Sequence, residues 1–194
     1  MKKDSNACLL DFIAEAGLLK NVKRSGWWVV GIKNPESVAE HCFRCAVLGY
    51  VLAMMENAEP QAVTLMCLFN DIHEARINDA HKMASCYLNY DEAEEKAFRD
   101  QIKALPKQMR GQLGQRRTDY TKQETKESII ARDADILECL LQAKEYYEQG
   151  YPQAKLFFQK APKFLKTKSA ASLWKSAKRW KSSDWWQRIA EFKR

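Results

Sequence analysis

Residues 65–79 read Leu-Met-Cys-Leu-Phe-Asn-Asp-Ile-His-Glu-Ala-Arg-Ile-Asn-Asp. An apolar run leads directly into four polar side chains, Asn70, Asp71, Glu74 and Asp79. A carboxylate at the end of an apolar helix is costly to bury unless it holds a metal, a proton or a partner charge. The stretch therefore predicts a buried helix that opens into a polar pocket, the floor of an active site.

The composition around this stretch is that of one globular domain. The chain has 194 residues, of which 46% are hydrophobic and 29% charged, with only 7 Gly and 5 Pro. We predict a single domain over residues 1–194, with a motif-bearing core at 20–150 and a basic, Trp-rich helical extension at 151–194. No signal peptide and no stretch of membrane-spanning length is expected, which predicts a cytoplasmic protein without a membrane partner.

The 6 cysteines lie in helical, mostly apolar contexts, which favours reduced thiols. Cys42 and Cys45 form a C-x-x-C pair inside a helical pattern, with no second pair to complete a zinc site. We interpret them as small buried hydrophobic residues.

Apolar periodicity predicts an all-α fold, because no segment alternates at period two over the length of a strand. Asn34 and Pro35 form a helix start, and Gly150 a stop. The expected helices cover residues 5–20, 35–56, 60–75, 91–105 and 122–149, with short ones near 77–86, from 106 to a loop at 111–118, and beyond 150.

Two of these helices also carry polar residues that are costly to bury. His41 faces inward or nearly so, and Asp135 lies with Asp133 on the apolar face of helix 122–149. A lone inward His is more often a core residue. If the helices pack together, however, His41 and Asp135 join Asp71 in a set that suits a divalent metal.

Further residues could complete such a site. Glu74, one turn beyond Asp71, could activate water or protonate a leaving group, and Asp79 could do the same or orient a sugar hydroxyl. In the loop at 21–35, Arg24 and Trp27 suit a binding loop over a pocket. The alternative is a hydrophobic lid, and we expect either Trp27 or Trp28 to pack on the core.

Three segments resemble the HD-domain phosphohydrolases, and more closely their 5'-deoxynucleotidase-like branch. They are Pro-Glu-Ser-Val-Ala-Glu-His at 35–41, Leu-Phe-Asn-Asp-Ile-His-Glu at 68–74 with Asp79, and Ala-Arg-Asp-Ala-Asp-Ile-Leu-Glu at 131–138. The resemblance covers residues 20–150. It implies an all-helical fold, a divalent metal (Mg, Mn or Co), a homodimer, and hydrolysis of a phosphomonoester, typically a deoxynucleoside 5'-monophosphate.

The same resemblance implies roles for individual residues. His41, Asp71 and Asp135 match metal ligands, and Glu74 and Asp79 match catalytic or substrate-orienting acids. Arg24 and Trp27 are similar to residues on the phosphate and base sides of the N-terminal loop.

One position departs from the motif, because Asn70 stands where the family has histidine. An amide oxygen can bind a metal, but it is neutral and a poorer ligand than imidazole for Co, Ni or Zn. Asn70 could be a weaker ligand that shifts preference toward Mg or Mn, or His73 could replace it from about one turn away. The third interpretation is a site that has lost metal and activity.

Three functions therefore compete. The leading one is a metal-dependent phosphohydrolase acting on nucleoside, and more specifically deoxynucleoside, 5'-monophosphates. The second is a catalytically impaired nucleotide-binding or regulatory relative. The third is nucleic-acid binding, since the net charge is +7 and residues 155–181 hold no Asp or Glu. We favour a solvated helical face anchored by tryptophans over this last function.

Overall fold

The structure is a computed structural model that describes residues 5–190. Over those residues it contains helices, one isolated bridge between Lys23 and Ser37, and no strand, so the all-α prediction is confirmed. The α-helices are α1 (Ser5–Leu18), α2 (Val38–Glu56), α3 (Pro60–Phe69), α4 (Glu74–Ile77), α5 (Tyr90–Ile102), α6 (Lys107–Lys122), α7 (Lys126–Glu148), α8 (Leu156–Lys160), α9 (Lys168–Ala177) and α10 (Asp184–Ile189). The 3-10 helices are η1 (Ser25–Val30), η2 (Ala84–Cys86), η3 (Pro152–Lys155) and η4 (Ala161–Phe164).

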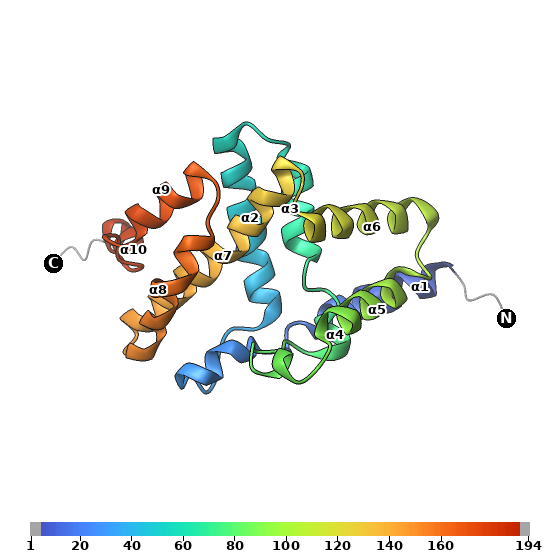
Figure 1. The fold of residues 1–194 in the computed structure, drawn as a ribbon, viewed down its shortest axis with the longest axis horizontal. Helices are drawn as coiled ribbons and strands as arrows, with labels where there is room; N and C mark the ends of the chain where they lie inside the picture. Colours follow the sequence, from blue (N-terminus) through green and yellow to red (C-terminus); the bar gives the residue numbers. More distant parts are fainter. Residues whose placement is uncertain (1–4, 191–194) are drawn as a thin grey trace.

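Helices α2, α3 and α7 form the centre of the molecule. Figure 1 shows α1, α4, α5 and α6 on one side of this centre and α8, α9 and α10 on the other. A cluster of buried side chains, including Leu52, Val63 and Leu137, joins the three central helices. The site residues predicted on 35–56 and 122–149 thus belong to two helices that pack against each other.

The approach of α2 to α3 depends on Gly49. A Cβ atom at this position would lie 2.7 Å from Cys67 Sγ and 3.1 Å from Val63 Cγ1. Both distances are shorter than ordinary van der Waals contact. Because the missing methyl group lets the helix backbones come close, Gly49 helps to set the distance between α2 and α3.

Several helix boundaries differ from the sequence prediction. Helix α2 begins after Ser37, whose hydroxyl accepts the Glu40 amide while Glu40 Oε2 accepts the Ser37 amide; this capping box takes the place of the cap expected at Asn34. Helix α6 continues through the loop expected at 111–118, because Leu113 and Tyr120 are buried on its inner face. Tertiary packing there outweighs the cost of two glycines.

Helix α3 stops at Phe69, so Asp71 and Glu74 do not share one continuous helix as expected. Arg117 of α6 donates a hydrogen bond of 3.0 Å to the carbonyl of Asn70, which α3 would otherwise use to continue. The residues between α3 and α4 therefore form turns, and these turns carry Asp71.

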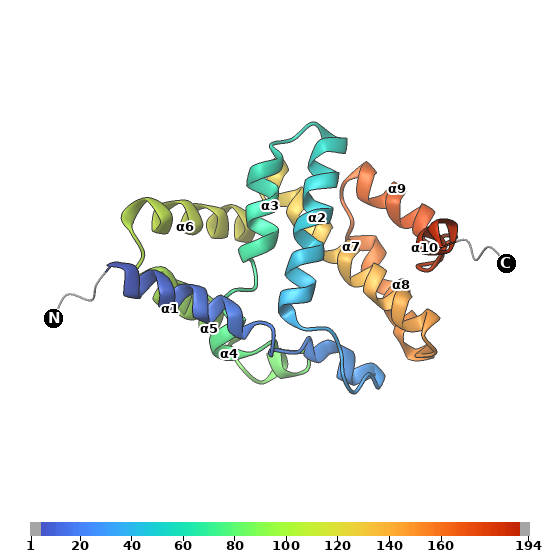
Figure 2. The same ribbon diagram turned by 180° about the vertical axis from the view of Figure 1, so that it is seen from behind.

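Helix α2 corrects one expectation about membranes. Its 19 residues have a hydropathy of 1.4 and are long and apolar enough to cross a bilayer by length and composition alone. A core helix meets the same criterion, and the inner face of α2 packs on α3 and α7 (Figure 2). Much of its opposite face is exposed.

The C-terminal region is anchored to the core through α9. Trp174 is buried there and packs against Phe158, while Asp133 of α7 accepts hydrogen bonds from the amides of Lys166 and Thr167. Asp133 thus holds the segment that leads into α9, which explains one of the two acids on the apolar face of α7.

Candidate active site

The three residues expected to converge do so around the imidazole of His41. His41 Nε2 lies 3.4 Å from Asp71 Oδ2 and 3.3 Å from Asp135 Oδ1. His41 comes from α2, Asp71 from the turn after α3, and Asp135 from α7. Close packing of the three central helices therefore creates a site from residues that lie far apart in the sequence.

The other nitrogen of His41 is held by an acid whose role sequence reasoning missed. His41 Nδ1 lies 2.5 Å from Oε2 of Glu138, which is fully buried. The Nε group of Arg44 donates to Glu138 Oε1 at 2.9 Å and balances its charge. A carboxylate on Nδ1 fixes the ring orientation and leaves Nε2 directed at Asp71 and Asp135. The only sequence signal was the i, i+3 spacing of Asp135 and Glu138 on one helix face.

Asp135 is braced in the same way. Its Oδ2 accepts hydrogen bonds of 3.1 Å from both the Tyr120 hydroxyl and Arg132 NH1. Its Oδ1 remains directed at His41. Tyr120 was not identified from the sequence, because only the packing of α6 on α7 places its hydroxyl at the site.

The charges of the cluster are strongly coupled. Burial lowers the pKa of His41 and Arg24 opposes its protonation, but hydrogen bonds that the imidazole donates to Asp135, Asp71 and Glu138 raise this pKa well above its usual value. Burial raises the pKa of Asp71 and Asp135, but His41 more than offsets this and holds both below the usual range. Both carboxylates are therefore anionic, and positive charge between them is stabilised.

The donor set fits a divalent cation. One imidazole nitrogen and two carboxylates are ligands that Mg, Mn and Co accept. Asn70 lies next to them and donates from Nδ2 to Asp71 Oδ1 at 2.7 Å. Its amide oxygen is buried and has no hydrogen-bond partner. A buried acceptor without a hydrogen-bond partner next to Asp71 suits a weak fourth ligand of a metal.

His41 also belongs to a second set of possible metal ligands, because ligand atoms of Glu36, His41 and Glu138 lie within 4.8 Å of one another. His41 Nδ1 and Glu138 are already engaged with each other, and Arg44 neutralises Glu138. Burial and the nearby Glu138 also raise the pKa of Glu36 to about 7, so its carboxyl group is only partly ionised near neutral pH. The Nε2 side of His41 is therefore the better place for a cation.

His73 does not take the place of the missing histidine. It is buried, and neither ring nitrogen forms a hydrogen bond. Its Nε2 lies 3.6 Å from Glu94 on α5, so this nitrogen faces away from the central helices.

Arg24, Glu74 and Asp79 lie on the elements around the cluster of His41 and the two aspartates. Arg24 NH1 lies 3.8 Å from Asp71 Oδ2. The amide of Ser25 donates to Asp79 Oδ2 at 2.5 Å, which ties the N-terminal loop to the segment after α4. Glu74 is buried, and its Oε2 has no hydrogen-bond partner. Burial, followed by the charges of Asp71 and Asp79, raises the pKa of Glu74 well above its usual value.

Asp79 follows a strained residue. Asn78 has φ of 62° and ψ of 167°, a region that residues other than glycine avoid. The conformation ends α4 and turns the chain so that Asp79 reaches Ser25. Strain of this kind persists only where the surrounding structure enforces it.

Trp27 is the tryptophan that packs on the core. Only 2% of it is exposed, its Nε1 donates to Glu36 at 3.0 Å, and its ring packs against Tyr146 and Phe157. This burial leaves no free ring face for a base and does not support the predicted substrate contact. The exposed indole of the loop is that of Trp28.

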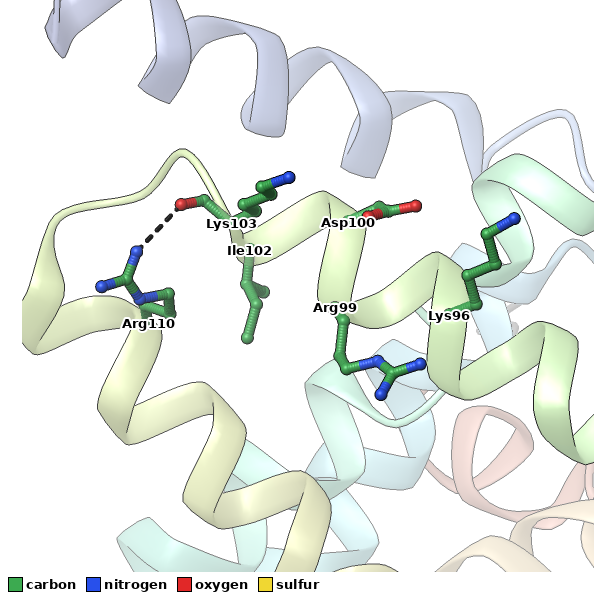
Figure 3. Close-up of a pocket in the computed structure, with 6 residues that line it drawn as sticks. All are labelled: Lys96, Arg99, Asp100, Ile102, Lys103 and Arg110. Atoms are coloured by element: carbon green, nitrogen blue, oxygen red, sulfur yellow. Dashed lines mark hydrogen bonds between the residues drawn. The ribbon is translucent and has the colours of Figure 1, made fainter.

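A separate hollow of about 560 Å³ lies between α5 and α6 (Figure 3). It is lined by Lys96, Arg99, Asp100, Ile102, Lys103 and Arg110. None of these residues belongs to the cluster around His41, and Arg110 is bound to the Lys103 carbonyl. The hollow is thus distinct from the candidate active site.

The fold is all-helical, and its candidate site joins an imidazole to two aspartates, a donor set that fits a divalent metal. A family model described as HD domain matches residues 16–176. The chain therefore belongs to the HD-domain family, and this membership implies a divalent metal.

Individual relatives agree with this assignment. A Mus musculus protein named 5'-deoxynucleotidase HDDC2 is 30% identical over 143 residues, which are 73% of this chain and 71% of that protein. A conserved hypothetical protein from Pyrococcus furiosus has a solved structure that matches with a TM-score of 0.76 at 28% identity, over 88% of this chain and 99% of its own. A predicted metal-dependent phosphohydrolase from Magnetospirillum magnetotacticum shares the fold, with a TM-score of 0.72 at 21% identity over 90% and 91% of the chains.

Proposed function

We propose that this protein removes phosphate from deoxynucleoside 5'-monophosphates, with a divalent metal held by His41, Asp71, Asp135 and, more weakly, Asn70. The observation that carries the proposal is the convergence of two anionic carboxylates on His41 Nε2, with bracing groups behind His41 and Asp135. The name of the mouse relative supports the substrate class.

Each remaining residue has a place in this reaction. His41, Asp71 and Asp135 would hold a divalent metal, which would polarise the phosphoryl group and lower the pKa of a bound water. Arg24 is a cation beside Asp71 and binds phosphate oxygens. Glu74 holds a proton for the leaving 5' oxygen, and its buried, unpartnered Oε2 favours this role. Asp79, fixed at Oδ2 by the Ser25 amide, directs its other oxygen to a sugar hydroxyl.

The proposal includes two features that the family resemblance and the cysteines support. The protein acts in the cytoplasm, as its 6 free cysteines favour. It also works as a homodimer. Nucleic acid is not among the proposed partners. Trp174 packs in the core, as a helical face anchored by tryptophans requires, whereas Trp185 and Trp186 are exposed and do not anchor this region.

The test is phosphate release from a panel of nucleoside and deoxynucleoside monophosphates with Mg, Mn and Co. We expect turnover of deoxynucleotides, and a lower Co concentration for half-maximal activity in Asn70→His, because imidazole is a better ligand for Co than an amide oxygen is. Arg24→Ala should raise KM. No turnover with any metal, in either the wild type or Asn70→His, would contradict the proposal.

Asn70 also favours a second candidate, a nucleotide-binding protein without catalysis. A neutral ligand in place of imidazole weakens the metal site. Calorimetry that shows tight nucleotide binding in a protein that releases no phosphate would establish this alternative.

A further inference from the structure

The hollow between α5 and α6 is lined mostly by cations (Figure 3). Four of its six lining side chains are positively charged and exposed: Lys96, Arg99, Lys103 and Arg110. The other two are Asp100 and Ile102, and Figure 3 shows Ile102 between Arg99 and Arg110. We call this surface the basic hollow. Its volume of about 560 Å³ is within the range of sites that hold small molecules.

Most of the positive charge of the basic hollow is not neutralised by the residues that the structure describes. Within residues 5–190, the arginines that α5 and α6 use for ion pairs are Arg116 and Arg117, which do not line the hollow. Asp100 offsets only one of the four charges. Residues 101–118 add to the excess, because they contain five Lys or Arg and no Asp or Glu. An exposed excess of one sign attracts a ligand of the opposite charge.

The spacing of the cations favours an anion that is longer than one phosphate group. Lys96 and Lys103 are two turns apart on α5, about 10 Å along the helix axis. A single phosphate group is too small to contact both, whereas a chain of phosphates can follow the helix past Arg99. Arg110 approaches from α6, and guanidinium groups bind phosphate oxygens through paired hydrogen bonds.

The two helices that form the basic hollow also hold the turn at Asp71 from both sides. Gln101 of α5 donates a hydrogen bond of 2.9 Å to the carbonyl of Ile72. Arg117 of α6 donates one of 3.0 Å to the carbonyl of Asn70. The carbonyls before and after Asp71 are therefore each fixed by one of these helices.

The two donors are closely connected to the basic hollow. Gln101 directly precedes Ile102, which lines the hollow. Arg117 forms ion pairs with Glu94 and Glu95 of α5, so it joins the two helices. An anion that contacts cations of both helices would restrain the two donors relative to each other.

We propose that the basic hollow is an effector site for a polyphosphate anion, either inorganic or the phosphate chain of a nucleotide, and that its binding restrains the turn that carries Asp71. A ligand shifts an equilibrium only through a difference in affinity between two states. Here the favoured state is the one in which α5 and α6 are held together. The binding site is independent of the proposed reaction, because none of its residues contacts the cluster around His41.

The first experiment measures binding of inorganic triphosphate by calorimetry, in buffer freed of metal by a chelating resin. Arg99→Gln and Arg110→Gln, one from each helix, should each weaken binding about 10-fold, because each removes charge-assisted hydrogen bonds. Lys122→Gln is the matched control, since Lys122 is an exposed cation at the other end of α6 and does not line the hollow. It should bind triphosphate as the wild type does, and circular dichroism checks that each variant is folded.

Two further arms identify the site and the ligand. Arg24→Ala should bind triphosphate as the wild type does, which separates the basic hollow from the candidate active site. A titration with dATP in the same buffer compares the two sources of the phosphate chain. Equal affinity would support recognition of the phosphates alone, and tighter binding of dATP would support a nucleotide as the ligand.

The second experiment measures the coupling to Asp71 by hydrogen exchange of the backbone amides at 72–76. Saturating triphosphate should slow this exchange about 5-fold or more in the wild type, because opening of the turn becomes less favourable. Gln101→Met has a side chain of similar length that cannot donate to the Ile72 carbonyl. This variant should bind triphosphate as the wild type does and lose most of the slowing.

The proposed site would be overturned by a wild type that binds no triphosphate at millimolar concentration. Unchanged affinity in both Arg99→Gln and Arg110→Gln, or a loss of binding in Arg24→Ala alone, would also overturn it. Unchanged exchange in the saturated wild type would overturn the coupling to Asp71. Neither measurement uses turnover, so a protein that releases no phosphate from nucleotides could still confirm the effector site.

Discussion

The two halves of the candidate site are built differently. On the α2–α7 side, His41 and Asp135 are each fixed by a second polar group, Glu138 and Tyr120 respectively. On the α3–α4 side, the amide oxygen of Asn70 and one oxygen of Glu74 are buried without hydrogen bonds. Buried polar atoms without partners are costly, and they are common where a ligand completes the site.

The difference separates two tasks. Rigid, braced ligands pre-organise a metal site and keep its geometry. Groups whose hydrogen bonds are left open can form them with a metal, water or substrate. Isosteric substitutions should therefore reduce activity more in the braced half than in the open half. Side chains of the open half should be the ones that form new hydrogen bonds when a ligand binds.

The largest effect is expected at Asp135 in the braced half. Asp135→Asn removes a charged ligand and should lower kcat/KM for the best deoxynucleotide by about 10³-fold, the equivalent of ~4 kcal/mol. The matched control is Asp133→Asn, two residues away, because Asp133 binds backbone amides at 166 and 167 rather than His41. That control should lower the thermal midpoint and leave the kcat/KM of folded protein within a few-fold. Equal losses in both variants would refute the distinction.

The next effect concerns the group behind the imidazole. Glu138→Gln keeps an acceptor near His41 but removes its charge, and should weaken metal binding by about 10–100-fold in calorimetry. Glu145→Gln is the control, because Glu145 contacts Arg44 at 2.7 Å but does not contact His41. If both variants bind metal equally well, Glu138 does not tune the imidazole.

A smaller effect is expected in the open half, at the strained residue before Asp79. Asn78→Gly should raise the free energy of unfolding by about 1 kcal/mol, since relieved strain exceeds the added backbone entropy of the unfolded chain. Asn57→Gly should give less, because Asn57 has φ of 54° and ψ of 48°, a left-handed conformation that asparagine accepts. Urea denaturation measures both. A loss of stability in Asn78→Gly would show that the position is unstrained.

The smallest effect is the pH dependence of the ion pair that ties α4 to α1. Hydrogen bonds from Arg76 lower the pKa of Glu15 below its usual value, against a smaller effect of burial. The pair therefore stabilises the fold above the pKa of glutamate in the unfolded chain, and the contribution is lost as pH falls through the lower folded value. Because both side chains are partly exposed and their attraction is screened by water, removing the pair in Glu15→Gln should cost only a few tenths of a kcal/mol at neutral pH. Chemical denaturation should show a larger difference between wild type and variant at pH 7 than at pH 3.

The sequence predicted the converging residues of the braced half better than the groups that support them. His41 and Asp135 were identifiable because polar residues on apolar helix faces are expensive. Tyr120 and Arg44 were not, since their roles depend on which helices pack together. Trp27 illustrates the same limit, because a loop tryptophan can face either a pocket or the core.

The apolar periodicity also could not predict where helices are interrupted. The apolar pattern continues past Phe69, but the structure ends α3 there because Arg117 takes the Asn70 carbonyl. The strained turn at Asn78 likewise depends on Asp79 reaching Ser25, a contact 54 residues away in the chain. Both features result from long-range contacts, which short sequence windows do not contain.

Gly49 gives the protein a position at which natural variation is restricted by geometry alone. Every single-base change in a glycine codon that alters the amino acid introduces a Cβ atom, and here that atom would meet Cys67 and Val63. In a deep mutational scan, the codon for residue 49 should therefore be depleted of all replacements, including alanine. His41 lies two turns away on the same helix, so the depletion would report on the spacing of the helices that carry the site.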